Sequence, residues 1–157
     1  LMGIPSFDTP DYSELFSEEK EMVGKLKKAF LMVAGAAVQK YGMDLDAHQQ
    51  LLMAAADMLI EIYVAESTVL RTEKLAKKVG EDKAKEQIAM AKLYLYKAVD
   101  VVAQKGKESI ISFAEGDEQR MMLMGLRRFT KYTNMPNIVG LRETITTKLV
   151  AENSYCF

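Results

Sequence analysis

Four long stretches of this sequence carry apolar residues at helical spacing, and a glycine followed closely by aspartate separates them three times. Glycine suits the left-handed residue just past a helix end, and an aspartate side chain accepts unpaired N–H groups of the next first turn. All three prolines lie outside the periodic stretches. We therefore expect an all-α fold. The three breaks are Gly42 with Asp44 and Asp46, Gly80 with Asp82, and Gly116 with Asp117.

The breaks predict helices over roughly 18–41, 46–79, 82–113 and 117–132, with a shorter last helix after the turn at 134–137. Short connections place neighbouring helices antiparallel, so the expected architecture is an up-down antiparallel helical bundle of about four long helices plus a shorter C-terminal helix. We expect residues 1–17 to be a largely extended leading segment and residues 18–157 to form a single helical bundle domain. Gly106 is a candidate bend in the third helix.

Periodicity also predicts which side chains enter the core. The first helix should bury Met22, Leu26, Ala29, Phe30, Val33 and Ala37. The second shows Leu52, Ala55, Leu59, Ile62, Val69 and Ala76, and the fourth presents Met121, Met124 and Phe129. In the last helix the expected core residues are Leu141, Ile145 and Leu149. In the third helix they are Ala84, Ile88, Ala91, Leu95, Ala98, Val102, Ile110 and Phe113.

Composition excludes several classes of function. The net charge of -1 gives no reason to expect nucleic acid as a partner. Cys156 is the only cysteine, which fits a reducing, intracellular setting (cytoplasm, or an organelle in a eukaryote). No uncharged stretch approaches the ~20 apolar residues that span a bilayer. Residues 1–5 lack the features of a signal peptide and are typical of an excised piece of a longer chain.

The first two helices carry more apolar surface than one small core needs. Residues 29–38 are apolar nearly all round the helix, and residues 51–56 repeat this. A helix without a polar face is usually buried on several sides. Either a further body covers this helical hairpin, or the hairpin lies at the centre of the chain's own core; the sequence leaves both readings open.

Candidate catalytic and metal-binding residues are few. His48 is the only histidine, so a site with two histidine ligands cannot form, and a surface or capping role is expected. Asp57 and Glu61 share a helix face that Asp100 could approach, but solvated or interface charges explain them more simply. The glycines form no phosphate-binding loop. We therefore predict no catalytic, cofactor-binding or metal-binding residue in this chain.

Two charged regions of the sequence are expected to lie on the protein surface. Arg127, Arg128 and Lys131, interleaved with Phe129 and Tyr132, form a basic cluster typical of a solvated face. The second helix should extend beyond the start of the first, which brings its lysine-rich end within reach of an acidic leading segment. The residues concerned are Lys74, Lys77 and Lys78, and Asp8, Asp11 and Glu14.

The second helix also resembles a known family. Its run from Ala55 to Val64 reads AADMLIEIYV and continues with a leucine and arginine, Leu70 and Arg71. This is similar to the C-terminal helical extension of very-long-chain-type acyl-CoA dehydrogenases. Residues 21–41, which end in a Lys-Tyr-Gly turn, the paired glutamines at 49–50 and the small-polar chain end at 151–157 resemble the same family.

The resemblance implies a supporting role in which this domain takes no direct part in the reaction. Members of the family are flavoproteins that use FAD to desaturate acyl-CoA thioesters, and their FAD, substrate and catalytic glutamate belong to a body that precedes the extension. Glu115 lies in a superficially similar motif, but that motif precedes the extension in the family, and a helix-end role accounts for Glu115. The resemblance implies packing on the catalytic portion of the same enzyme, support of a homodimer and association with a membrane surface.

The residues expected to pack against such a partner lie on the first hairpin. They are Phe30, Val33, Ala36, Ala37, Leu52, Ala55, Asp57, Tyr63 and Arg71. The alternative is a stand-alone helical protein-interaction adaptor with no enzymatic parent, which would use the same hairpin.

Overall fold

The computed structural model describes residues 12–157 and contains five α-helices and two short 3-10 turns within that range. The predicted all-α bundle is confirmed. The helix bounds agree with the sequence prediction to within three residues, because the helices are interrupted near the expected glycine and proline positions. The elements are α1 Ser17–Tyr41, η1 Gly42–Ala47, α2 Gln49–Val79, η2 Asp82–Ala84, α3 Lys85–Phe113, α4 Gly116–Phe129 and α5 Ile138–Glu152.

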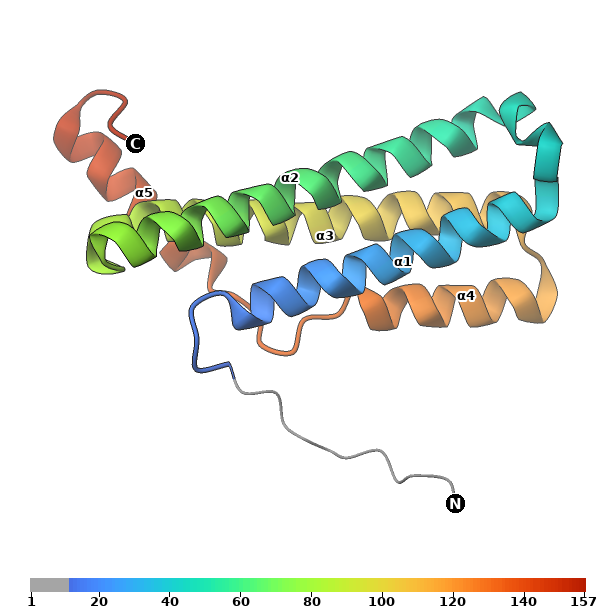
Figure 1. Ribbon diagram of the computed structural model, residues 1–157, viewed down its shortest axis with the longest axis horizontal. Coiled ribbons are helices and arrows are strands. Elements are labelled where there is room, and N and C mark those ends of the chain that lie inside the picture. Colours follow the sequence, from blue (N-terminus) through green and yellow to red (C-terminus); the bar gives the residue numbers. More distant parts are fainter. Residues whose placement is uncertain (1–11) are drawn as a thin grey trace, which may run out of the picture.

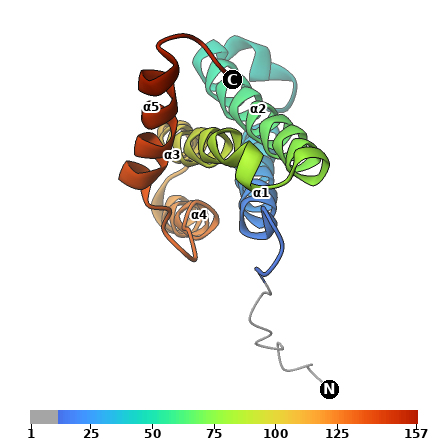
Figure 2. The same cartoon turned by 90° about the vertical axis from the view of Figure 1, so that its left-hand side faces the viewer.

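The four long helices run alternately up and down (Figure 1). Helices α1 and α3 pack against each other at the centre, and α2 and α4 lie on opposite sides of that pair (Figure 2). The shorter α5 packs on α3 alone among the helices, near the end where α2 stops. No described helix is both long and apolar enough to cross a membrane. The predicted extended segment 1–17 falls mostly on residues outside the described range.

The core is built from small and medium apolar side chains on α1, α2 and α3. Met22, Leu26 and Val33 of α1 are fully buried, as are Met58 of α2 and Leu95 of α3. The prediction for α1 is confirmed except at Phe30, which is half-buried against the core. On η2 and α3 the expected core residues are buried except Ile88, which is half-buried.

Two helices differ in part from the predicted core positions. On α2 the predicted Ile62, Val69 and Ala76 are buried. Near its start, however, Ala54 and Met58 are buried, whereas Leu52 and Leu59 are exposed and Ala55 is half-buried. On α4 the core residues are Met122 and Leu126, while the predicted Met121 and Met124 face outward. Both helices carry apolar residues on several sides, so periodicity alone could not select the buried side. On α5 no residue is fully buried.

The helix ends follow the glycine prediction better than the aspartate prediction. Gly42 and Gly80 end α1 and α2 with positive φ, as expected, but Gly116 begins α4 rather than ending α3. None of the expected aspartates caps a helix by its side chain, because 3-10 turns or extended residues occupy those positions. The side-chain cap that does form is at Asn137, whose Oδ1 accepts from the Gly140 N–H at 3.1 Å.

Gly106 serves close packing rather than a bend. Helix α3 continues through this position to Phe113, and Gly106 is buried. A Cβ placed there would lie 2.9 Å from Leu126 Cδ1 of α4 and 3.6 Å from Met58 Cε of α2. The missing side chain therefore lets α4 approach α3 at this level of the bundle.

Candidate interaction surface

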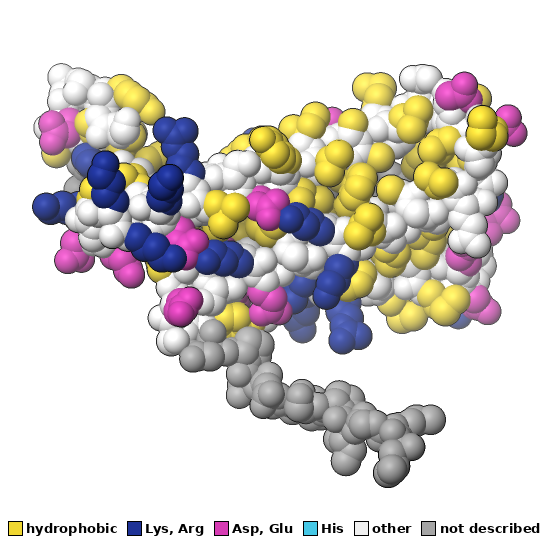
Figure 3. Space-filling view, viewed as in Figure 1, with side chains coloured by type: hydrophobic (Ala, Val, Ile, Leu, Met, Phe, Trp, Pro, Cys, Tyr) yellow, Lys and Arg dark blue, Asp and Glu magenta, His cyan; other side chains and the backbone are white. Residues whose placement is uncertain are grey.

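The face of the bundle drawn in Figure 3 has an apolar half and a more highly charged half. Hydrophobic side chains gather over the η1 end of α1 and α2 and over α4, whereas Lys, Arg, Asp and Glu dominate the opposite end (Figure 3). Contiguous exposed apolar groups of this kind mark contact surfaces in soluble proteins. We therefore take the apolar half as the candidate site and describe its two parts separately.

The first part, here called the α1–α4 face, is defined by the exposed apolar side chains of these two helices, Leu31 and Val38 on α1 and Met121 and Met124 on α4. Leu31 retains 66% of its side-chain exposure and Met121 retains 62%. The two helices approach each other closely, since a Cβ at Gly125 of α4 would lie only 3.0 Å from Met32 Sδ of α1.

The second part, here called the α2 stripe, lies on the side of α2 that faces away from the core. The same helix turns Ala54, Met58, Ile62, Ala65 and Val69 inward, so α2 is apolar on two opposite sides. The exposed stripe consists of Leu52, Ala56, Leu59, Ile60, Tyr63 and Leu70.

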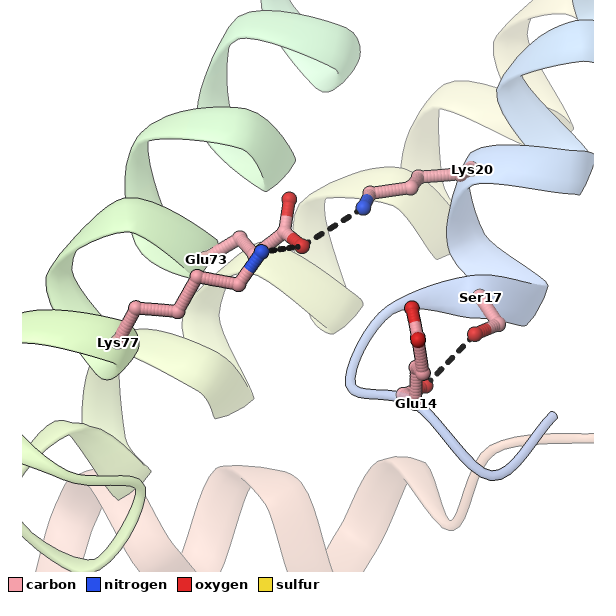
Figure 4. Close-up of polar contacts among 5 residues, drawn as sticks. All are labelled: Glu14, Ser17, Lys20, Glu73 and Lys77. Carbon is pink, nitrogen blue, oxygen red and sulfur yellow. Dashed lines mark hydrogen bonds and ion pairs between the residues drawn. The ribbon is translucent and has the colours of Figure 1, made fainter.

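At the charged end, ion pairs tie α2 to α1. The Glu73 carboxylate is buried and accepts from Lys20 Nζ of α1 and Lys77 Nζ of α2, each at 2.7 Å (Figure 4). Hydrogen bonds from Lys20 and then Lys77 hold the pKa of Glu73 below its ordinary value, although burial acts in the opposite direction. Glu14 lies beside this cluster and helps to raise the pKa of Lys77, to which the Glu73 hydrogen bond contributes most.

A further ion pair crosses the hairpin nearer its middle. Lys27 of α1 and Glu66 of α2 meet at 2.6 Å. Beyond it, toward η1, the hairpin exposes the apolar side chains Leu31, Val38, Leu52 and Leu59. Polar contacts thus fix α1 against α2 at one end and leave the other end available for an apolar partner. Asp8 and Asp11, expected near the lysine-rich end, lie outside the described residues.

The nine predicted interface residues differ in how exposed they are in the structure. Leu52, Tyr63 and Arg71 are exposed on α2, with Tyr63 at 69%. Val33 and Ala37 are buried in the bundle's own core, so assigning them to an outer surface was wrong. The remaining four residues, Phe30, Ala36, Ala55 and Asp57, are half-buried.

Leu31, Val38 and Ile60 were missed as individual surface residues. Each is apolar at a helix position turned away from the buried stripe, and that mismatch is the signal that could have found them. The Lys20–Glu73 contact was missed as well. The sequence feature that could have indicated this contact is Glu73, a glutamate next to the lysines at the end of α2.

The carboxylates considered for metal chemistry do not come together. Asp57 pairs with Lys105 at 3.2 Å, and Glu61 accepts from the Tyr94 hydroxyl at 2.9 Å. Asp100 lies on the surface with Arg142 in reach of the same hollow. No group of three potential ligands forms within residues 12–157. The arrangement offers ion pairs and a phenol hydrogen bond rather than a coordination site.

The other candidates occupy surface or helix-end positions. Glu115 is exposed and precedes α4, where its carbonyl accepts from the Gln119 N–H. His48 precedes α2, and its ring lies 3.7 Å from the Tyr41 ring, centroid to centroid. Arg127, Arg128 and Lys131 are exposed.

Comparison with known proteins identifies the same domain from sequence and from shape. A family described as "Acyl-CoA dehydrogenase, C-terminal domain" matches residues 25–128. A "Probable acyl-CoA dehydrogenase" of Bacillus subtilis (strain 168) is 37% identical over 140 residues, which are 89% of this chain and 24% of that protein.

A solved structure agrees with this match. The crystal structure of an acyl-CoA dehydrogenase complexed with FAD from Bacillus anthracis is similar with a TM-score of 0.87 and 36% identity. The similarity covers 92% of this chain and 24% of that one, so the chain spans about a quarter of the length of either relative. By residues matched and by fold, this chain belongs to the acyl-CoA dehydrogenase C-terminal domain family.

Proposed function

We propose that this chain is a non-catalytic helical domain of an FAD-dependent acyl-CoA dehydrogenase, and that its α1–α4 face packs on the catalytic body of the same enzyme. The observation that carries the proposal is the exposure of Leu31 and Val38 on α1 and of Met121 and Met124 on α4. Burying a leucine or methionine side chain stabilises a contact by about 1.5–3 kcal/mol, so four such groups favour a covered state.

The proposal assigns FAD and the acyl-CoA substrate to the remainder of the enzyme. Support comes from the coverage of the relatives: a B. anthracis acyl-CoA dehydrogenase that carries FAD matches this chain over 24% of its own length. Desaturation of an acyl-CoA thioester therefore needs residues beyond this domain. The same match favours an enzymatic parent over a stand-alone adaptor.

A membrane surface receives less support than a protein partner. The apolar half of the hairpin carries Asp44 and Asp46 at its η1 end and Glu66 near its middle. Carboxylates beside an apolar face oppose binding to anionic lipid, whereas interfacial helices usually surround their apolar face with lysine and arginine.

The proposal is tested by joining the two parts of the enzyme. The polypeptide encoded upstream of Leu1 is produced with FAD, mixed with this chain and analysed by sedimentation velocity. We expect a single species that contains both. Leu31→Glu should weaken this association about tenfold or more, because it would bury a charge against the body. Leu31 is a better probe than Ala36, which is half-buried against the chain's own core.

Val139→Glu is the matched control. Val139 is as exposed as Leu31, at 64%, but lies on α5 away from the α1–α4 face. This variant should bind as the wild type does. Failure of the wild-type chain to associate, or equal binding by Leu31→Glu, would show that the α1–α4 face is not the attachment surface.

A further inference from the structure

One outward row of side chains on α4 changes from apolar to basic along the helix. Met121, Met124 and Arg128 follow steps of three and four residues, so they lie in line on one side of α4. Arg127 lies about one turn beyond Met124 as well, at a step of three. All four side chains are exposed. The apolar part of α4 that belongs to the α1–α4 face therefore continues directly into two arginines.

Lys28 of α1 adds a third cation at the same end of this helix pair. Helices α1 and α4 are antiparallel (Figure 1), and Met32 of α1 comes close to Gly125 of α4. About one turn from this contact toward the start of α1 is Lys28, which is exposed. The same shift toward the end of α4 reaches Phe129, the neighbour of Arg128 in the sequence. The exposed cations of the two helices thus lie at one level of the bundle.

These three cations have no ion-pair partner among residues 12–157. At the other end of the same row, by contrast, Asp117 pairs with Arg120 at 3.4 Å. Cations beside an apolar contact are complementary to carboxylates on the surface that covers it. Arginine suits such a contact especially well, because its planar guanidinium can pair with a carboxylate through two parallel hydrogen bonds.

We propose that the catalytic body presents a group of carboxylates to Arg127, Arg128 and Lys28, and that these pairs set the direction in which the domain docks. The inference rests on the proposed function, in which the α1–α4 face meets that body. An apolar row alone accepts a partner in either direction. With carboxylates at one end only, the reversed direction is disfavoured, because it places them beside Asp117.

An anionic lipid surface is less suited to this cluster than a protein surface. Asp117 and Glu118 are exposed in the first turn of α4, whereas the arginines are in its last turn. A membrane that lay along the helix would meet both charges, and the carboxylates would oppose its binding. A protein surface can instead carry a different charge opposite each end.

Association kinetics with the upstream polypeptide, produced with FAD, test the charge match. Arg127→Gln with Arg128→Gln should weaken binding about five- to tenfold, mainly by slowing association, because exposed charges act chiefly on the encounter of the two partners. The difference from the wild type should shrink as salt concentration rises. Lys83→Gln with Lys85→Gln is the matched control, since both lysines are exposed in η2 and at the start of α3. The control should bind nearly as the wild type does.

A zero-length cross-link tests directly whether carboxylates lie opposite α4. Arg128→Lys keeps the positive charge and places an amine at position 128, which a carbodiimide joins to an adjacent carboxylate as an amide. We expect peptide mass measurement to show position 128 linked to an aspartate or glutamate of the upstream polypeptide, and Lys83 not linked to it. A complex in which position 128 forms no such link would overturn the proposal.

The outcomes separate this inference from the proposed function. Equal affinity of the wild type and the double arginine variant for the upstream polypeptide overturns the charge match and leaves the attachment role intact. If that variant instead loses binding only to phosphatidylglycerol vesicles, the cluster binds lipid and the proposal is wrong. Failure of the wild-type chain to associate at all contradicts both.

Discussion

Lys20 of α1 and Glu73 of α2 lie 53 positions apart in the chain, and the ammonium and carboxylate groups meet at 2.7 Å. The carboxylate is buried while Lys20 and the second partner, Lys77, stay partly in water. This contact joins α1 to α2 at the charged end of the hairpin. It also makes the stability of the hairpin depend on pH.

Glu73→Gln should lower the free energy of unfolding by about 1 kcal/mol at pH 7. Because the native pKa of Glu73 is depressed, the pair contributes fully above the ordinary carboxyl pKa and is lost as pH falls through the lowered value. The difference between wild type and variant should therefore be constant near neutral pH and disappear in acid. Urea unfolding across this pH range measures it.

Glu66→Gln is the control for that experiment, since the Lys27–Glu66 pair also joins α1 to α2 but is more exposed. An exposed pair contributes at most about 1 kcal/mol and often much less. If both variants lost the same stability with the same pH dependence, burial of Glu73 would not be the cause.

Gly106→Ala should destabilise the bundle although alanine favours helix. The new Cβ would lie 2.9 Å from Leu126 Cδ1 and 3.2 Å from Cδ2, and overpacking of a core costs about 1–3 kcal/mol. Gly24→Ala, in an interior position of α1 with no neighbouring atom within 4 Å, should instead gain up to about 1 kcal/mol. Thermal melting compares the two. Stabilisation by both substitutions would contradict the close approach of α4.

Two half-buried tyrosines should respond oppositely to loss of the hydroxyl. The Tyr94 hydroxyl donates to Glu61 at 2.9 Å, so Tyr94→Phe should cost about 1 kcal/mol. The Tyr132 hydroxyl is buried without a hydrogen-bond partner in the described part of the chain, so Tyr132→Phe should be neutral or stabilising by up to about 1 kcal/mol. Urea unfolding of both variants checks this, and a larger loss at Tyr132 would contradict it.

The phenol groups also report on burial by titration. Burial, followed by the hydrogen bond to Glu61, raises the pKa of Tyr94 to about 12. Burial is likewise the main cause that raises the pKa of Tyr132. In an absorbance titration, Tyr94→Phe should therefore lack one phenol ionisation of the wild type, and the missing ionisation should be one that occurs only in strongly alkaline solution. Loss of one that ionises near its ordinary pKa would place Tyr94 in solvent.

Asn137→Ala should loosen α5 more than Asp117→Ala loosens α4. Asn137 accepts the Gly140 N–H at the start of its helix, and removal of such a cap costs about 1 kcal/mol. Asp117 makes no capping hydrogen bond and has only an exposed contact with Arg120 at 3.4 Å. Amide hydrogen exchange measured in each helix should accelerate in α5 alone, and an equal effect in α4 would be inconsistent with these caps.

The sequence predicts the helices of this bundle better than their orientation. Gly42, Gly80 and Pro136 mark breaks that any packing must respect, so the helix bounds are set locally. The rotation of α2 and α4 is not set locally. With Leu52 and Met53 beside Ala54, several sides of α2 are apolar, and only packing against α1 and α3 selects Ala54 and Met58 for the core.

The same ambiguity limits the prediction of the surface. The excess of apolar residues on the first hairpin is evident from the sequence, and periodicity places Val33 in the core. Which exposed residues, such as Leu31, form a surface cannot be predicted until the neighbouring helices are placed against α1. Capping shows a related limit. Asp46 looks like a helix start, yet the chain forms the 3-10 turn η1 there and α2 begins at Gln49.

Oxidation of methionine side chains in the intact enzyme tests the central claim most directly, because this chain carries its own control. Met121 and Met124 lie on the α1–α4 face, while Met135 lies in the loop before α5, and all three are exposed here. With peroxide followed by peptide mass measurement, we predict that Met121 and Met124 are protected in the full-length protein and that Met135 oxidises as in the isolated chain. Equal oxidation of all three in both forms would contradict coverage of the α1–α4 face.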